Sequence, residues 1–276
     1  MKYKYIVSSD LDGTLLARGE KISPENASAI AEMKERGICF APNSGRTIGE
    51  MPEAVLRNPD IRYYIGADGS AIWDKETDRL FELAMSAEEA KPVLDIMWSY
   101  DTVNTVRSKG RSYVDTHKCS EEIFCAHRLG PLDLAFVEYY VNKVDNFKEF
   151  VRGLDSIGMI AAYFLSDEDM NECRERIEAL GDYKVASSAP KNIEIFHKRA
   201  GKGNGLLALA DMLGVPRENT VAVGDSKNDL DMLEKAGVSL AMGNGTEEVM
   251  AAAHRTICRC EEHSARYILE NVIGKE

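Results

Sequence analysis

Two short apolar runs near opposite ends of the chain each lead into a cluster of acidic residues. Residues 5–7 (YIV) precede 10–14 (DLDGT), and residues 220–223 (TVAV) precede 224–229 (GDSKND). Such runs are typical of buried parallel strands, and ligands bind beyond the carboxyl ends of these strands in open α/β sheets. Carboxylates gathered there repel one another unless a cation joins them, and hard oxygen ligands suit Mg²⁺. The pattern therefore predicts an α/β fold with a metal-assisted site.

The first third and the last third of the chain alternate strand and helix patterns. Ser23 and Pro24 have the types expected at the N-cap and first position of a helix, which runs to Arg36 and stops at Gly37. This alternation indicates βαβ units with parallel crossovers. It predicts strands over 38–41, 63–65, 193–196, 220–223 and 238–241, and further helices over 48–56, 203–213, 230–235 and 264–272.

The middle of the chain has a different pattern. Ser86 and Glu89 form a capping box that opens a helix, and strand-like residues 102–107 and 111–114 flank a Lys109-Gly110 turn, as in a hairpin. Helices are predicted over 147–157 and 167–180. This mixture indicates a separate α+β module. We therefore predict a core of residues 1–83 and 189–276 and an inserted domain of residues 84–188.

Charge and hydropathy exclude several classes of protein. The 276 residues carry a formal net charge of −12, which argues against a general nucleic-acid or anionic-membrane surface. No uncharged run approaches the roughly 18 residues needed to span a bilayer, and the first ten residues lack the apolar stretch of a signal peptide. We therefore expect a cytoplasmic protein whose six dispersed cysteines are reduced.

The first acidic segment has the residues needed for covalent phosphate chemistry. Asp10 can attack phosphorus to form an aspartyl-phosphate, and Asp12 can protonate the leaving oxygen and then deprotonate the hydrolytic water. A simple Asp-Gly turn is the alternative. An EF-hand is excluded because Gly13 comes too early in the segment.

The other polar motifs also allow two interpretations each. The Asp225 cluster can be a metal site or an acidic helix N-terminus that favours the helix dipole. Ser44 and Gly45 stand between a strand and a helix, where a hydroxyl and backbone N–H groups can hold a phosphate oxygen. Lys202 lies between two glycines, which leaves room for a ligand, although a lone lysine is commonly a solvated surface residue.

Taken in order, the four motifs resemble those of the haloacid dehalogenase superfamily. They are Asp10-x-Asp12-Gly-Thr, Ser44, Lys202 and Gly224-Asp225-x-x-Asn228-Asp229. Aspartate at both 10 and 12 resembles the phosphatases of that superfamily rather than its dehalogenases. Ser44 lies 34 residues after Asp10, and Lys202 lies 158 residues after Ser44. This spacing resembles the Cof-type phosphatases, whose α/β cap sits between the second and third motifs.

The resemblance implies a Rossmann-like core, with a mainly parallel sheet flanked by helices, and an inserted α+β cap domain. It also implies roles for the motif residues. Mg²⁺ would be held by the side chains of Asp10 and Asp225 and the backbone carbonyl of Asp12, with Asp229 in support. Ser44, Gly45 and Lys202 would bind the transferring phosphoryl group, with Asn228 nearby. Residues 65–71 (IGADGSA) resemble the segment where the subfamily has Asn-Gly-Ala.

The predicted function is a Mg²⁺-dependent phosphatase of a small phosphorylated metabolite, such as a sugar phosphate or a phosphorylated cofactor. A phosphomutase or a non-catalytic phospho-ligand-binding protein on the same fold is the alternative. A further cluster in the inserted domain, His117, Cys119, Cys125 and His127, allows a zinc site, but a cap surface or a substrate-facing loop is the favoured interpretation. The sequence leaves the oligomeric state open.

Overall fold

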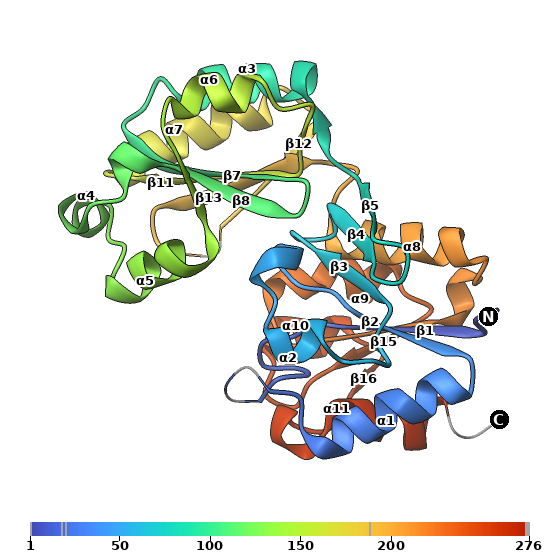
Figure 1. The fold of residues 1–276 in the computed structure, drawn as a ribbon. Helices are drawn as coiled ribbons and strands as arrows, with labels where there is room; N and C mark the ends of the chain where they lie inside the picture. The colour runs from blue at the N-terminus through green and yellow to red at the C-terminus, as the bar shows by residue number, and fades with distance from the viewer. Residues whose placement is uncertain (1, 18, 20, 188, 274–276) are drawn as a thin grey trace. The chain divides into compact units, whose positions relative to one another are not determined.

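The computed structural model describes residues 2–17, 19, 21–187 and 189–273, which fall into two compact units (Figure 1). One unit comprises Met1–Phe81 and Gly201–Glu276, and the other comprises Glu82–Ala200. The second unit is thus an insertion in the first. The units divide after residues 81 and 200, whereas the sequence predicted divisions after 83 and 188. Residue 188, the predicted end of the insertion, lies outside the described residues.

The first unit is built on a parallel five-stranded sheet in the order β16-β15-β14-β1-β2. Its strands are β1 (Tyr5–Ser9), β2 (Ile38–Pro42), β14 (Thr220–Gly224), β15 (Val238–Ala241) and β16 (Arg255–Thr256). A smaller sheet follows in the order β3-β4-β5, with strands β3 (Tyr63–Gly66), β4 (Ala71–Asp74) and β5 (Arg79–Glu82). A parallel bridge between Asn43 and Ile65 places the end of β3 beside the end of β2.

Helices cover both faces of the five-stranded sheet. They are α1 (Pro24–Glu35), α2 (Glu53–Leu56), α8 (Lys202–Leu213), α9 (Leu230–Lys235), α10 (Glu247–Ala252) and α11 (Ser264–Ile268). Val7 packs in one apolar cluster with residues of α1 and α11, and its neighbour Ile6 packs in another with residues of α8 and α9. Successive side chains of a strand point to opposite faces, so both faces of the sheet are apolar. This accounts for the unbroken apolar runs in the sequence.

A local signal in this unit predicted the start of α1. Ser23 caps α1 by accepting a hydrogen bond from the Asn26 backbone N–H at 3.2 Å. The predicted helix over 48–56 is wrong, because a 3₁₀ turn at Ile48–Glu50 is separated from α2 by Met51 and Pro52. A proline disfavours helical backbone at the preceding residue, which interrupts the helix at Met51.

The inserted unit contains a six-stranded sheet in the order β12-β13-β11-β7-β8-β9. Every pairing is antiparallel except that of β8 with β9. The strands are β7 (Thr102–Ser108), β8 (Arg111–Asp115), β9 (Asn142–Val144), β11 (Met159–Phe164), β12 (Tyr183–Ala186) and β13 (Asn192–His197), with a small pair formed by β6 (Met85–Ser86) and β10 (Ser156–Ile157). The helices are α3 (Ala87–Met97), α4 (Glu121–Ala126), α5 (Pro131–Tyr140), α6 (Phe147–Arg152) and α7 (Asp167–Glu178). Helices α3, α6 and α7 lie over one face of this sheet (Figure 1).

Strand β13 corrects one prediction. The sequence placed 193–196 in the core, but β13 pairs with β11 and β12 inside the inserted unit. Ile193 and Ile195 are buried there in the cluster formed with α3 and α7. A short apolar run is equally suited to either sheet, so its pairing partners decide its place.

In the described part of the chain, no helix is long and apolar enough to cross a membrane.

Candidate active site

The predicted site residues stand where the parallel strands end. Asp10 directly follows β1, and Asp225 directly follows the adjacent β14. Backbone hydrogen bonds continue beyond the strand ends, from Asp10 N to Val223 O at 3.0 Å and from Ser44 N to Ile65 O of β3 at 3.0 Å. The carboxyl ends of parallel strands meet at one edge of a sheet. The site therefore forms at the edge that the sequence indicates.

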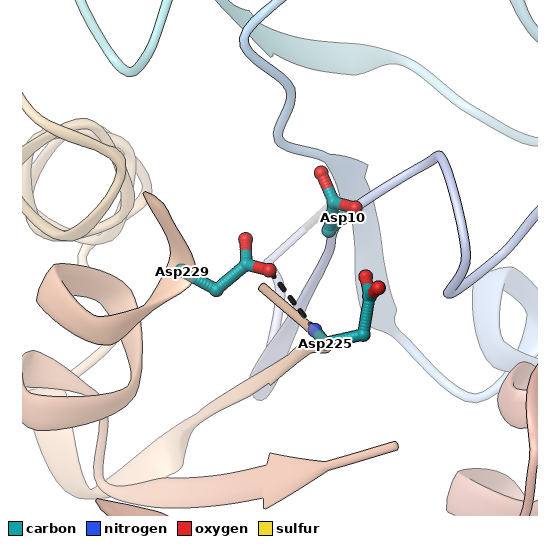
Figure 2. A group of neighbouring side chains, drawn as sticks. All are labelled: Asp10, Asp225 and Asp229. Carbon is teal, nitrogen blue, oxygen red and sulfur yellow. Dashed lines mark hydrogen bonds between the residues drawn. The ribbon is translucent and has the colours of Figure 1, made fainter. Parts of the chain in front are cut away.

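Three aspartates form an acidic cluster at this edge (Figure 2). One carboxylate oxygen from each of Asp10, Asp225 and Asp229 lies within 4.8 Å of the others. Asp229 is fixed by its neighbours, because its Oδ2 accepts the backbone N–H of Asp225 at 2.9 Å and of Ser226 at 3.0 Å. The cluster thus consists of three carboxylates on two loops that are far apart in the sequence.

Lys202 is the cation that joins two of these carboxylates. Lys202 lies at the start of α8, and its side chain is fully buried. Nζ lies 2.7 Å from Asp10 Oδ1 and 2.7 Å from Asp229 Oδ1. Burial opposes the charged form of Lys202, but the two carboxylates outweigh burial and raise its pKa. The interpretation of Lys202 as a solvated surface lysine is therefore wrong.

One ammonium does not balance three carboxylates. The pKa of Asp10 is raised to about 8, chiefly by burial and also by the charges of Asp229 and Asp225, while Lys202 acts against this rise. The pKa of Asp225 is also raised, chiefly by burial. A bound cation would relieve this repulsion, since both groups would then be stable as carboxylates. The donors are all oxygens, which suits a hard divalent ion such as Mg²⁺, so the residues present fit such a metal.

Gly13 and Thr14 hold Asp225 in place. Thr14 Oγ1 donates a hydrogen bond to Asp225 Oδ1 at 2.9 Å. Gly13 has a φ of +81°, and a Cβ at this position would lie 2.6 Å from Asp225 Oδ2. Glycine is therefore required both for the turn and for the close approach of the carboxylate.

Asp12 does not join the acidic cluster through its side chain, which is 58% exposed. It forms a two-point ion pair with Arg46, with Nε 2.9 Å from Oδ2 and Nη2 3.0 Å from Oδ1. A carboxylate held in this way has a fixed direction in space. The predicted acid–base residue is therefore positioned by an arginine from the loop that contains Ser44.

The remaining predicted residues line the loops beside Lys202. Ser44 is buried, and its Oγ accepts the Arg46 backbone N–H at 3.2 Å, which leaves the hydroxyl hydrogen for donation. Asn228 Nδ2 lies 3.4 Å from Asp68 Oδ1. Asp68 in turn donates its backbone N–H to Ser44 O at 3.1 Å. A chain of contacts thus connects Ser44, Asp68 and Asn228.

Family comparison gives the site its context. A model of the haloacid dehalogenase-like hydrolase family matches residues 7–269. The chain belongs to this family. The predicted fold class, an α/β core with an inserted α+β cap, is confirmed, and so is the prediction of a haloacid dehalogenase-like hydrolase of the Cof type.

Relatives of this haloacid dehalogenase-like hydrolase match it over nearly their full length. It is 28% identical to the phosphatase YwpJ of Bacillus subtilis, over 97% of this chain and 99% of that protein. It is 26% identical to the 5-amino-6-(5-phospho-D-ribitylamino)uracil phosphatase YwtE of the same species, over 97% and 98%. A solved haloacid dehalogenase-like hydrolase from B. subtilis is 26% identical, with a TM-score of 0.78 and coverage of 97% and 99%. The predicted enzyme class, a phosphoric monoester hydrolase, is confirmed.

The sequence patterns did not predict two residues that support this site. Arg46 follows the predicted Ser44-Gly45 pair directly, yet its ion pair with Asp12 depends on the approach of two loops. Asn43 was also missed; its Nδ2 donates to the Lys202 backbone carbonyl at 2.9 Å. The only signal for either residue was its place after a buried strand.

Two members of the histidine and cysteine cluster of the inserted unit make local hydrogen bonds. The buried His127 makes a hydrogen bond through Nδ1 to Ile123 O at 2.8 Å, and Cys119 donates to Asp115 O at 3.2 Å. In the described residues, the group able to hold a metal is the aspartate cluster of the first unit. The six cysteines are free thiols.

Proposed function

We propose that this chain is a Mg²⁺-dependent phosphatase that hydrolyses a small phosphorylated metabolite through an aspartyl-phosphate on Asp10. The observation that carries the proposal is the contact of Asp10 with a buried ammonium, 2.7 Å from Lys202 Nζ, within a cluster of three aspartates. A carboxylate can approach a phosphate dianion only where cations offset the repulsion between them. Asp10 has such a cation beside it, the ammonium of Lys202.

In the first half-reaction, a carboxylate oxygen of Asp10 forms a bond to phosphorus while the ester P–O bond breaks. The departing oxygen takes a proton from Asp12, so the alcohol leaves neutral. In the second half-reaction, water attacks the phosphorus and gives its proton to Asp12. Asp10 leaves as a carboxylate, and inorganic phosphate is released. The Asp12 side chain is exposed and its direction is set by Arg46; because both of its oxygens accept from Arg46, one of these contacts would open when Asp12 carries the proton.

Three groups would hold the phosphoryl oxygens in this scheme. The Lys202 ammonium lies beside Asp10, and the Ser44 hydroxyl and the Asn228 amide lie on loops at the same sheet edge. The Gly45 backbone N–H would add a fourth donor. Preorganised donors of this kind stabilise charge that develops on the transferring group.

The side chains of Asp10 and Asp225 and the backbone carbonyl of Asp12 would hold the Mg²⁺ ion. Bound there, the ion would supply positive charge that neutralises phosphate and nucleophile together. Asp229 would act indirectly, because its Oδ1 accepts from Lys202 and its Oδ2 accepts two backbone N–H groups. This arrangement holds Lys202 and the Asp225 loop in place.

The substrate would be a small phosphorylated metabolite such as a sugar phosphate or a phosphorylated cofactor. The relative YwtE is named for a substrate that carries a phosphorylated ribityl chain. This supports a polyol phosphate or a related compound as the substrate class. A cytoplasmic location and the absence of nucleic-acid and membrane partners remain predictions.

A phosphate-release screen over a panel of phosphorylated metabolites tests the proposal. Wild-type protein with Mg²⁺ should release phosphate without a bisphosphate activator, and EDTA should stop the reaction. Asp10→Asn should be inactive, with deamidation excluded by mass spectrometry. Bisphosphate-dependent return of the phosphoryl group to a sugar, without phosphate release, would indicate a phosphomutase. Full activity of Asp10→Asn would overturn the covalent mechanism.

A further inference from the structure

The proposed mechanism leaves one buried carboxylate at the site unused. Asp68 follows β3 and is 9% exposed. Its Oδ1 lies 3.4 Å from Asn228 Nδ2. A Cβ built on Gly45 would lie 3.2 Å and 3.3 Å from the two carboxylate oxygens, so the side chain packs against the Gly45 backbone. Asp68 is therefore in contact with two residues proposed to bind the phosphoryl group.

The backbone around Asp68 is strained. Ala67 and Asp68 have φ values of 49° and 50°, and Gly69 follows with 83°. Positive φ is unfavourable for residues with a Cβ, although aspartate tolerates it better than alanine does. Consecutive residues keep a positive-φ conformation only where the surrounding structure holds them in it, and such backbone strain is found most at functional sites.

Two neighbouring loops hold this turn. The backbone N–H groups of Ala67 and Asp68 donate to Arg46 O at 2.8 Å and to Ser44 O at 3.1 Å. On the other side, a Cβ on Gly69 would lie 2.0 Å from Gly201 O, so the turn is in close contact with the loop that precedes Lys202. The fold therefore fixes the Asp68 carboxylate between the Ser44 loop and the Lys202 loop.

Hydrogen bonding fixes the orientation of the Asn228 amide. Asn228 Oδ1 accepts from Ser226 Oγ at 2.7 Å, and Nδ2 faces Asp68. A carboxylate only accepts, so the amide nitrogen must point at Asp68 and the amide oxygen away from it. One hydrogen of Nδ2 faces Asp68, so the planar amide fixes the direction of the other hydrogen. A direct contact of Asp68 with phosphate is disfavoured, because two negative groups repel each other.

We propose that Asp68 is a positioning residue for phosphate binding, which acts by orienting the Asn228 amide toward a phosphate oxygen. The inference rests on the proposed function, because it takes the phosphoryl site to lie beside Ser44 and Lys202. It assigns Asp68 no proton transfer and no metal contact. Its effect should therefore depend on the presence of Asn228 and on hydrogen-bond acceptance by residue 68 rather than on its charge.

A double-mutant cycle on phosphate affinity tests this inference. Binding of inorganic phosphate to the full chain in Mg²⁺ is measured by calorimetry for wild type, Asp68→Gly, Asn228→Ala and the double variant. Glycine removes the carboxylate and adopts the positive φ without strain. If Asp68→Gly does not fold, Asp68→Ala takes its place in the cycle. Each single variant should bind phosphate about tenfold more weakly, which is the cost of one hydrogen bond to a charged ligand. The phosphate affinity of the double variant should be no lower than that of Asn228→Ala.

Two further variants separate orientation from charge and from general damage. Asp68→Asn keeps an acceptor for Asn228 and should lose roughly threefold or less in phosphate affinity. Asp211→Ala removes an exposed aspartate of α8 and should bind phosphate as wild type does. Additive losses in the cycle, or a loss in Asp68→Asn equal to that in Asp68→Gly, would overturn the inference.

The experiment distinguishes failure of the inference on Asp68 from failure of the proposed phosphatase function. Phosphate binding without turnover of any phosphoester would refute the phosphatase, while the cycle would still decide the role of Asp68. A wild-type protein that does not bind phosphate in Mg²⁺ would overturn the inference itself. Thermal unfolding of each variant identifies losses that arise from misfolding.

Discussion

Arg46 and Asp12 form a two-point ion pair, with Arg46 Nε 2.9 Å from Asp12 Oδ2 and Nη2 3.0 Å from Oδ1. The planar guanidinium matches the carboxylate and sets its direction. Asp12 is the residue proposed to protonate the leaving group. The rate of proton transfer to the leaving group should therefore depend on Arg46.

Replacement of Arg46 should harm poor leaving groups most. Arg46→Met should lower kcat/KM for an alkyl phosphate about tenfold more than for p-nitrophenyl phosphate, because p-nitrophenolate leaves without a proton. Arg46→Lys should behave like Arg46→Met, since one ammonium cannot form the two-point contact. Arg57→Met, at an exposed arginine of the same unit, is the matched control. Equal losses on both esters would show that Arg46 does not act through Asp12.

Removal of Lys202 should damage both activity and stability. Lys202→Met leaves the buried Asp10 and Asp229 without their shared cation, and loss of one partner of a buried ion pair costs about 3–5 kcal/mol. We expect a lower melting temperature without metal and a fall in kcat/KM of roughly a hundredfold or more. Lys2→Met, at an exposed lysine, should change neither quantity. A Lys202→Met protein with normal turnover would contradict the assignment.

Asp10 should make the metal-free protein less stable as pH rises. Its pKa is raised from 3.8 to about 8, so the folded state holds the proton more tightly than the unfolded chain does. The stabilisation is fully present below pH 3.8 and is lost as pH rises through about 8. Asp10→Asn should therefore melt a few degrees above wild type near pH 8 in EDTA, and the difference should shrink toward pH 4. A constant difference across this range would contradict the shift.

Asp225 should be required for stabilisation by metal. Mg²⁺ should raise the melting temperature of wild-type protein, because an ion that binds only the folded state stabilises it by mass action. Asp225→Ala should lose most of this increase, whereas Asp211→Ala should keep it. The measurement needs no substrate. An equal response to Mg²⁺ in wild type and Asp225→Ala would place the ion elsewhere.

Local sequence signals specified the elements whose determinants are short. The Ser86 capping box opens α3, with its Oγ accepting the Glu89 N–H at 3.2 Å, as the two residue types predict. The hairpin of β7 and β8 turns at Lys109 and Gly110, which both have positive φ. The interrupted helix near Pro52 shows the limit of periodicity, because one proline outweighs the apolar spacing around it.

Pairing over long distances was harder to predict. The run that became β13 was expected beside the core strands, yet it lies between β11 and β12 of the inserted unit. Strand β11 itself was not predicted from its run of small and apolar residues. Apolar strands have similar compositions in both sheets, and their partners are chosen by packing across the whole unit.

The sequence by itself determined the chemical inventory of the site. The order of strand, acidic loop and helix predicted that Asp10 and Asp225 would meet at one sheet edge, because parallel strands direct their carboxyl ends to the same side. Only the tertiary structure decided which charges are paired. Lys202 lies 192 residues from Asp10 and 27 from Asp229, yet its ammonium contacts both. Such contacts depend on the approach of separate loops and on burial, which strengthens the attraction between opposite charges, and neither property is encoded in a local pattern.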